Sequence, residues 1–163
     1  MDTLEITTND GVFFASYSER GLHHLDFPDK FGEEVTAART PVTPGVLAWH
    51  RLTETAVRAV LAGISIPALP PLDVSDGTDF QRRVWAALQR LPVGATESYG
   101  GIARKLGAEG AARAVGGACG SNPIPLLIPC HRVLAANHKL GGFSGGLDWK
   151  LKLLAREGVT FAI

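Results

Sequence analysis

The chain of 163 residues has only two cysteines, no net charge and no long apolar run. No apolar stretch approaches the roughly 18–20 residues that cross a membrane, and the acidic N-terminus shows no signal-peptide pattern. Cys119 and Cys130 are not part of a CxxC spacing, and Cys/His zinc sites need about four suitably spaced ligands. We therefore expect a cytoplasmic protein with reduced thiols, no membrane contact, no bound metal and no cofactor.

The zero net charge conceals a division into an acidic and a basic half. Residues 1–79 carry five Lys/Arg and twelve Asp/Glu, and residues 80–163 carry eleven Lys/Arg and four Asp/Glu, so the halves bear net charges of −7 and +7. Such asymmetry suggests a C-terminal half that meets a polyanion. Unrelated solvated faces explain the charges equally well.

The N-terminal half has the pattern of a small antiparallel sheet followed by a helix. Short strands are predicted at 4–8, 12–17 and 22–27, because turn signals containing glycine separate them. Apolar residues at helical spacing predict a helix at 46–61, ended by Gly63.

A domain boundary is predicted near residue 76, where three prolines are followed by two aspartates and Gly77. The switch from acidic to basic composition falls at the same place. We therefore predict an α/β support domain at 1–76 and a mostly helical domain at 77–163.

Helix signals are strong in the second half of the chain. Thr78 and Gln81 form a capping box ahead of an apolar stripe, which predicts the start of a helix. Ser98 is a suitable N-cap for a helix at 99–106, and a glycine-bearing turn leads to another helix at 111–120. Two short helices joined in this way are typical of a helix-turn-helix, although most helical hairpins do not touch nucleic acid.

The second of these helices is unusual because small residues surround one long cation, Arg113. Ala112, Ala114, Gly116 and Gly117 allow another backbone to approach closely, although glycine costs roughly 1 kcal/mol relative to alanine in a helix. Either the helix packs tightly with Arg113 in solvent, or it lies flush against DNA with the arginine protruding. The basic character of this half favours DNA.

The segment 128–133, Ile-Pro-Cys-His-Arg-Val, places Cys130 beside His131 and Arg132. A thiol is a strong nucleophile only as a thiolate, and neighbouring basic or cationic groups lower its pKa. The segment therefore predicts a reactive cysteine. The alternative is a small buried hydrophobe with an unrelated histidine next to it.

The C-terminal half resembles the 6-O-alkylguanine-DNA alkyltransferases, also called methylated-DNA–protein-cysteine methyltransferases. The likeness covers about residues 78–158 and depends on several ordered motifs, whereas the first 75 residues are similar only in strand pattern. The resemblance implies an α+β fold with a ribonuclease H-like N-terminal domain and a winged-helix-like, helix-turn-helix C-terminal domain. The motifs are Phe80-Gln81 with Val84-Trp85, Ser98-Tyr99-Gly100, Ala112-Arg113-Ala114-Val115-Gly116, Asn122-Pro123, Pro129-Cys130-His131-Arg132-Val133, Gly142-Phe143-Ser144-Gly145-Gly146 and Glu157-Gly158.

The chemistry implied by the resemblance is irreversible transfer of an alkyl group from a guanine oxygen to the sulfur of Cys130. Glu157 orients His131, and His131 draws the proton from Cys130 through a water. Tyr99 supplies a phenol near guanine N3, and Asn122 ties the helix-turn-helix to the active-site segment. Because an S-alkyl cysteine is a stable thioether, each molecule acts once.

The base pocket implied by the resemblance contains five further residues. The Ser144 backbone and the carbonyls of Val133 and of the acceptor cysteine hold the edge of the base, and Pro125 contacts its face. Phe143 forms an apolar wall where some members have tyrosine, and Cys119 stands where a bulkier apolar side chain is common. We expect this smaller side chain to admit larger alkyl groups.

The partner implied by the resemblance is duplex DNA that contains O-6-alkylguanine, bound by a monomer. The target atom lies inside the stacked duplex, so the nucleotide has to be flipped out, against stacking and pairing. Arg113 fills the vacated stack, and the small residues around it let the helix lie in the minor groove. A zinc site of the kind that some relatives carry is not expected, because the N-terminal half has no cysteine.

Two other functions stay open at this point. A cysteine hydrolase that uses Cys130 and His131 requires an irregular backbone, since adjacent side chains on a regular strand point to opposite faces. A DNA-binding regulator without chemistry depends only on Arg113 and the helix-turn-helix.

Overall fold

Three antiparallel strands form the sheet of the N-terminal half, in the order β1 (Asp2–Thr8), β2 (Gly11–Tyr17) and β3 (Leu22–Asp26). They confirm the three predicted strands to within one or two residues at each end. Side chains such as Ile6 and Phe13 are fully buried, as expected for a sheet that is covered on one face. The structure is a computed structural model that describes residues 1–28, 42–143 and 146–161.

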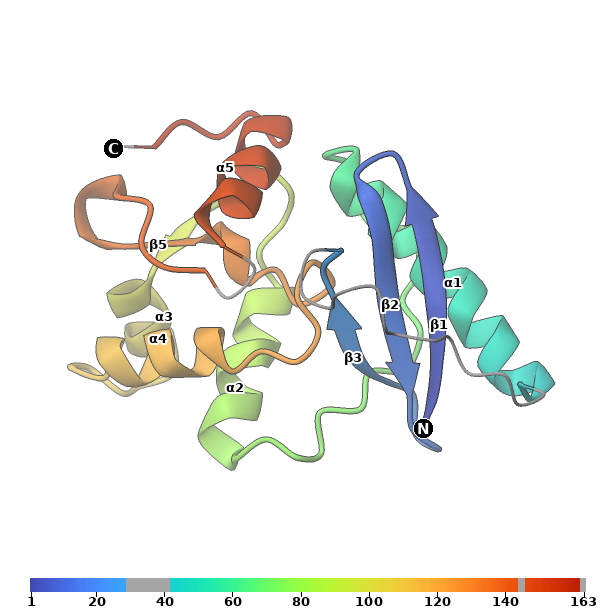
Figure 1. Ribbon diagram of the computed structural model, residues 1–163. Helices are drawn as coiled ribbons and strands as arrows, with labels where there is room; N and C mark the ends of the chain where they lie inside the picture. Colours follow the sequence, from blue (N-terminus) through green and yellow to red (C-terminus); the bar gives the residue numbers. More distant parts are fainter. Residues whose placement is uncertain (29–41, 144–145, 162–163) are drawn as a thin grey trace.

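Helix α1 (Pro44–Leu61) packs against this sheet (Figure 1) and confirms the predicted helix, which begins two residues earlier than expected. Thr43 caps its first turn, because the hydroxyl accepts a hydrogen bond from the Val46 amide. The helix buries Ala56 and Val60 in the core. The helix therefore covers one face of the N-terminal sheet.

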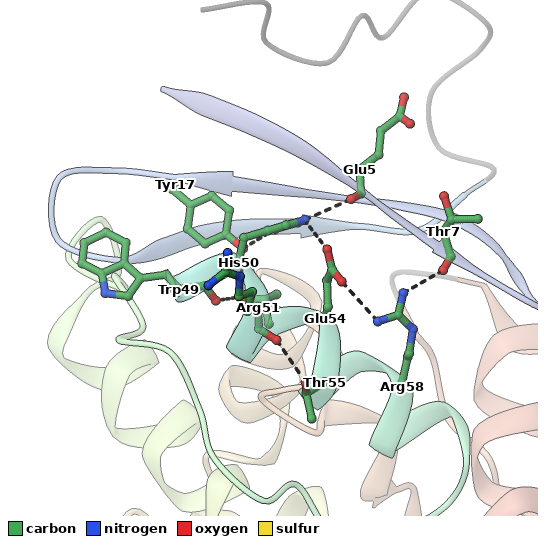
Figure 2. Close-up of polar contacts among 10 residues, drawn as sticks. Glu5, Thr7, Tyr17, Trp49, His50, Arg51, Glu54, Thr55 and Arg58 are labelled. Carbon is green, nitrogen blue, oxygen red and sulfur yellow. Dashed lines mark hydrogen bonds and ion pairs between the residues drawn. The ribbon is translucent and has the colours of Figure 1, made fainter. Parts of the chain in front are cut away.

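A buried polar cluster joins α1 to the sheet, as Figure 2 shows. The Tyr17 hydroxyl lies 2.8 Å from Nδ1 of His50 and 2.9 Å from Oγ1 of Thr53. Nε2 of His50 donates to the Glu5 carbonyl at 3.0 Å. Because buried polar groups are costly unless they are paired, this network fixes the orientation of the helix on the strands.

The C-terminal half is mostly helical, as predicted (Figure 1). Thr78 and Gln81 form the predicted capping box, and the Ser98 hydroxyl accepts from the Gly101 amide at the start of the next helix. Local hydrogen bonds therefore set where these helices begin. The helices are α2 (Asp79–Gln89), α3 (Tyr99–Lys105), α4 (Ala112–Gly120) and α5 (Leu147–Arg156).

Three short features of this half were not predicted. Strand β4 (Glu97–Ser98) pairs in parallel with β5 (Val133–Leu134), and 3-10 turns occur at η1 (Cys130–Arg132) and η2 (Ala136–His138). The β4–β5 pairing joins the start of α3 to the residues that follow η1. It therefore brings Tyr99 toward the candidate nucleophile although the two are far apart in the sequence.

The two halves share one hydrophobic core. The Trp149 ring of α5 lies 5.5 Å from the Phe13 ring and 5.0 Å from the Phe27 ring, between centroids. At the end of α1, Gly63 has φ +71°, and a Cβ there would come within 2.2 Å of the Arg156 carbonyl oxygen. The α+β class is thus confirmed, with the two halves closely packed against each other.

None of the helices in the described ranges is both long and apolar enough to cross a lipid bilayer. No three His, Cys, Asp or Glu side chains of the described residues are grouped as ligands of a metal ion would be.

Candidate active site

Cys130 is the first residue of the turn η1 and is buried directly after Pro129. Two hydrogen bonds from Asn122 hold the segment that leads to it. Nδ2 of Asn122 donates to the Ile128 carbonyl at 2.8 Å, and Oδ1 accepts from the Ile124 amide at 3.0 Å. Because Asn122 lies just after α4, these bonds attach the turn to the end of the helix-turn-helix.

His131 is fully buried, and its Nε2 lies 3.1 Å from Oε1 of Glu157 at the end of α5. A carboxylate only accepts hydrogen bonds, so Nε2 carries the proton of the neutral ring. Nδ1 of His131 is the one buried side-chain nitrogen or oxygen in the described residues that has no hydrogen-bond partner. The imidazole of the residue that follows Cys130 in the chain therefore offers a free, buried lone pair.

Arg132 is a partner of Glu157 that sequence reasoning missed. Its Nη2 donates to Oε1 of Glu157 at 2.7 Å, and its Nη1 donates to the Leu91 carbonyl at 2.7 Å. Burial by itself would raise the pKa of Glu157, but the hydrogen bonds from His131 and Arg132 lower it to about 2. Glu157 thus stays ionised and holds the imidazole in one tautomer.

The basic residues next to Cys130 in the sequence predicted an acidic thiol, but the structure indicates a thiol that is less acidic than usual. Burial raises its pKa to about 11, although the Asn122 amide and the Lys150 ammonium partly offset this. Burial also lowers the pKa of His131, against the opposing effect of Glu157. The resting pair is therefore a neutral thiol and a neutral imidazole. A thiolate can form only as a base takes the proton.

A pocket of about 360 Å³ brings together four of the predicted site residues, Tyr99, Cys119, Cys130 and Phe143. Gly116, predicted to face DNA, lines the same pocket. Cys130, although buried, thus lines a cavity. Gly120 and Gly142 complete the lining among the described residues.

Tyr99 begins α3 and sits against the loop that carries Phe143. Burial raises the pKa of Tyr99 to about 12, so its hydroxyl keeps its proton and can donate. Gly141 has φ +69°, and a Cβ there would lie only 3.1 Å from the Tyr99 oxygen. The Phe143 ring packs edge-on against Phe27, at 5.8 Å between centroids. Phe27 of the N-terminal half therefore contacts a residue that lines the pocket.

Two predicted base-binding residues are not among the described residues that line the pocket. Pro125 and Val133 are buried nearby in the chain segment around Cys130. Ser144 lies outside the described residues. The roles predicted for these three residues stay predictions.

The residues predicted to bind DNA lie on α4, apart from Asn122, which follows the helix. Arg113, Ala114 and Gly117 are exposed and Ala112 is partly exposed, whereas the opposite side of the helix is buried. That buried side carries Cys119, which lines the pocket. One helix thus presents a face of small residues with a single cation and also closes the candidate active site.

Lys150 of α5 is a second residue that sequence reasoning missed. It is fully buried, and its Nζ donates to the carbonyls of Val133 at 2.7 Å and Gly142 at 3.0 Å. The signal in the sequence was its position, because Lys150 falls between Trp149 and Leu153 in the buried stripe of the helix.

Known proteins match this chain in both halves. Residues 79–159 match the model of the 6-O-methylguanine DNA methyltransferase DNA-binding domain. A methylated-DNA–protein-cysteine methyltransferase of Mycolicibacterium paratuberculosis is 62% identical over 81 residues, 50% of this chain and 49% of that protein, so the match spans about half the length of this relative. Another, from Shigella flexneri, is 40% identical over 148 residues, 90% of this chain and 81% of that protein. The chain belongs to the 6-O-methylguanine DNA methyltransferase family.

Solved structures of this methyltransferase family share its fold. The Mycobacterium tuberculosis protein OGT, crystallised in complex with DNA, superposes with a TM-score of 0.76 at 38% identity, covering 94% of this chain and 90% of that one. An O6-methylguanine DNA methyltransferase from Methanococcus jannaschii gives a TM-score of 0.67 at 29% identity, over 98% and 96% of the two chains. The structural likeness therefore extends to the N-terminal half, where the sequence was similar only in its strand pattern.

Proposed function

We propose that this chain repairs DNA by direct reversal: it binds duplex DNA, flips out O-6-alkylguanine and accepts the alkyl group on the sulfur of Cys130. The observation that most supports this proposal is that Cys130 lines a pocket and is followed in the chain by a buried histidine with an unpaired ring nitrogen. Cys130 lines the 360 Å³ pocket, and the adjacent His131 has its Nε2 on Glu157 and its Nδ1 without a protein partner among the described residues. The names of the relatives support the same chemistry.

The transfer forms a sulfur–carbon bond and breaks the bond between that carbon and guanine O6, so the guanine leaves with the electron pair. The proton of Cys130 passes through a water to Nδ1 of His131, and the carboxylate of Glu157 stabilises the imidazolium that results. Because the thiol pKa is raised to about 11, the proton has to leave as the alkyl group is transferred. The hydroxyl of Tyr99 donates to guanine N3 and stabilises the charge that develops on the base.

The same pocket would hold the flipped base. Phe143 and Cys119 form its walls, the Ser144 backbone and the Val133 carbonyl bind the edge of the guanine, and Pro125 lies against its face. Cys119 has a small side chain at the wall of the pocket, which supports acceptance of alkyl groups larger than methyl.

The DNA is bound by the helix-turn-helix of α3 and α4. The exposed small residues of α4 lie in the minor groove, and Arg113 enters the duplex where the flipped nucleotide was stacked. Its exposure on a helix whose other face closes the pocket supports this role. Asn122 then links DNA binding to the turn that carries Cys130, and the M. tuberculosis relative in complex with DNA supports the choice of partner.

We further infer that residues 1–76 and residues 77–163 form two domains with different roles. The first segment is a ribonuclease H-like support domain, and the second is a winged-helix-like domain that binds DNA and accepts the alkyl group. Phe27 of the first segment contacts Phe143, which lines the pocket, and this contact is consistent with a supporting role for that segment. The protein acts as a monomer on duplex DNA that contains O-6-alkylguanine.

Mass spectrometry tests this function directly. Mixing the protein with a duplex that contains O-6-methylguanine should add one methyl group per molecule, on the peptide that contains Cys130. Cys130→Ala should bind the duplex with unchanged affinity and gain no mass. Multiple turnovers on an ester or amide would instead identify a hydrolase, and full biological activity of Cys130→Ala would identify a DNA-binding regulator.

A further inference from the structure

Arg156 is the last residue of α5, and it links the end of that helix to the N-terminal half. Its guanidinium forms two hydrogen bonds with the Asp10 carboxylate, from Nη2 to Oδ1 at 2.6 Å and from Nη1 to Oδ2 at 3.0 Å. Asp10 lies in the turn between β1 and β2. A bidentate pair of an arginine and a carboxylate fixes geometry better than a single contact does. The pair therefore holds the turn of the sheet and the end of α5 in one arrangement.

The end of α1 contacts the same residue. Nη1 of Arg156 also donates to the Leu61 carbonyl at 3.1 Å. The backbone is close as well, because a Cβ at Gly63 would lie only 2.2 Å from the Arg156 carbonyl oxygen. In Figure 1 the β1–β2 turn and the ends of α1 and α5 lie together at the top of the molecule, away from α4. Both the side chain and the backbone of Arg156 thus contact the N-terminal half.

Glu157 directly follows Arg156 and is the C-cap of α5. The ends of helices open more readily than their interiors, yet the proposed proton transfer needs the Glu157 carboxylate on Nε2 of His131. Arg132 binds this carboxylate but not the end of the helix, and the Glu157 amide donates within α5, to the Leu153 carbonyl at 3.1 Å. A contact that keeps the last turn of α5 closed therefore acts on the group that orients the imidazole.

We propose that Asp10 and Arg156 are a pair of positioning residues for alkyl transfer: through them the N-terminal half holds the last turn of α5, and with it Glu157, against His131. This inference rests on the proposed function and gives the β1–β2 turn a part in it. The hydrogen bond from Arg156 holds the pKa of Asp10 below its ordinary value of 3.8, so the carboxylate is ionised at neutral pH. The side chains of Asp10 and Arg156 are 20% and 33% exposed. The pair is therefore partly screened by water, and its effect is moderate.

The test is the rate at which the Nε2 proton of His131 exchanges with water, measured by NMR saturation transfer on the protein without DNA. A buried imidazole proton that is bound to a carboxylate exchanges only when the structure around it opens. Asp10→Asn keeps the shape of the side chain but removes its charge, and it should raise this exchange rate about fivefold, as expected for a partly exposed ion pair. The Nε1 proton of Trp85, which is bonded to the Ala118 carbonyl at 2.8 Å, should exchange at the wild-type rate.

Arg156→Gln tests the pair from its other member, and it should also raise the His131 exchange rate about fivefold or more. Adding Asp10→Asn to Arg156→Gln should have no further effect, because the pair is already broken. Effects that add in the double variant would overturn the pairing. Arg58→Gln is the matched control, because Arg58 lines the same surface hollow but binds Glu54 and the Thr7 carbonyl, both in the N-terminal half. This control should exchange like the wild type.

A wild-type exchange rate of the His131 proton in Asp10→Asn or in Arg156→Gln would overturn the positioning role. Equal acceleration of the His131 and Trp85 protons would also overturn it, since that result reports a loss of stability of the whole domain and not the release of one helix end. The NMR measurement contains no DNA, so it stays decisive if O-6-methylguanine duplex leaves Cys130 unmodified and the proposed function fails.

With the proposed function intact, methyl transfer at saturating duplex should be about fivefold slower in Asp10→Asn. The affinity for DNA should not change, because Asp10 lies on the turn of the sheet and not on the helix-turn-helix. Faster exchange of the His131 proton together with an unchanged rate of methyl transfer would overturn the part of the pair in the reaction.

Discussion

Replacing Glu157 by glutamine should separate the electrostatic role of this side chain from its shape. The carboxylate is fully buried and is shared between Nε2 of His131 and the guanidinium of Arg132. Glu157→Gln keeps the size of the side chain but removes its charge, which leaves Arg132 buried beside a neutral group. Removing one partner of a buried pair is strongly destabilising.

The magnitude follows from the pKa of Glu157, which is lowered from 4.5 to about 2 by His131 and Arg132 against the effect of burial. Such a shift corresponds to about 3 kcal/mol of stability. Because the folded pKa is depressed, this stability is fully present above pH 4.5 and is lost as pH falls toward 2. Glu157→Gln should therefore lose about 3 kcal/mol at pH 7 but only about 1 kcal/mol at pH 3.

Urea unfolding at pH 7 and pH 3 measures both values, with Glu109→Gln as a control at an exposed glutamate. Methyl transfer by Glu157→Gln should slow by about a hundredfold or more at pH 7, because the imidazolium of His131 loses its counter-charge. The reasoning is refuted if Glu157→Gln unfolds at the wild-type urea concentration at pH 7. Equal destabilisation at both pH values would also refute it.

Arg113→Ala should slow repair of duplex about tenfold or more while leaving reaction with a free base analogue unchanged, since only the duplex needs its stack filled; equal loss on both substrates contradicts this role. Tyr99→Phe should slow methyl transfer about tenfold to a hundredfold at unchanged DNA affinity, because one donor to the departing base is lost. If two side chains, for instance Arg104 and Lys105, contact phosphates, the DNA affinity should fall about tenfold between 50 and 200 mM salt. An affinity that does not change with salt argues against a basic interface. Replacing Cys119 by leucine should reduce benzyl transfer more than methyl transfer, and an equal effect on both argues against a pocket widened at this wall.

Much of the fold was predictable from short-range patterns. The capping box of Thr78 and Gln81 and the Ser98 cap predicted helix starts that the structure confirms, because these bonds join residues close in the chain. The strand segments followed from the turn signals that separate them. The parallel pairing of β4 with β5 was not predictable in this way, since it joins segments that are distant in sequence.

The candidate site was predictable as a set of residues but not as an electrostatic environment. Cys130, His131, Glu157 and Tyr99 were identified from their motifs, and the structure brings His131 and Glu157 into contact and Tyr99 and Cys130 into one pocket. The sequence suggested a thiol acidified by its neighbours, whereas burial raises the pKa of Cys130 to about 11. Desolvation depends on which residues cover a group, and the adjacent residues in the sequence do not reveal this.

The amino-acid sequence by itself determined which reactive groups and helix caps this protein has, because these are properties of residue types and their local order. Only the tertiary structure decided that Arg132 shares Glu157 with His131, and that Lys150 is enclosed with its Nζ on the carbonyls of Val133 and Gly142. A long cation on a helix is expected in solvent. The burial of Lys150 depends on the packing of α5 against segments that are distant in the sequence, which exclude water from one face of the helix.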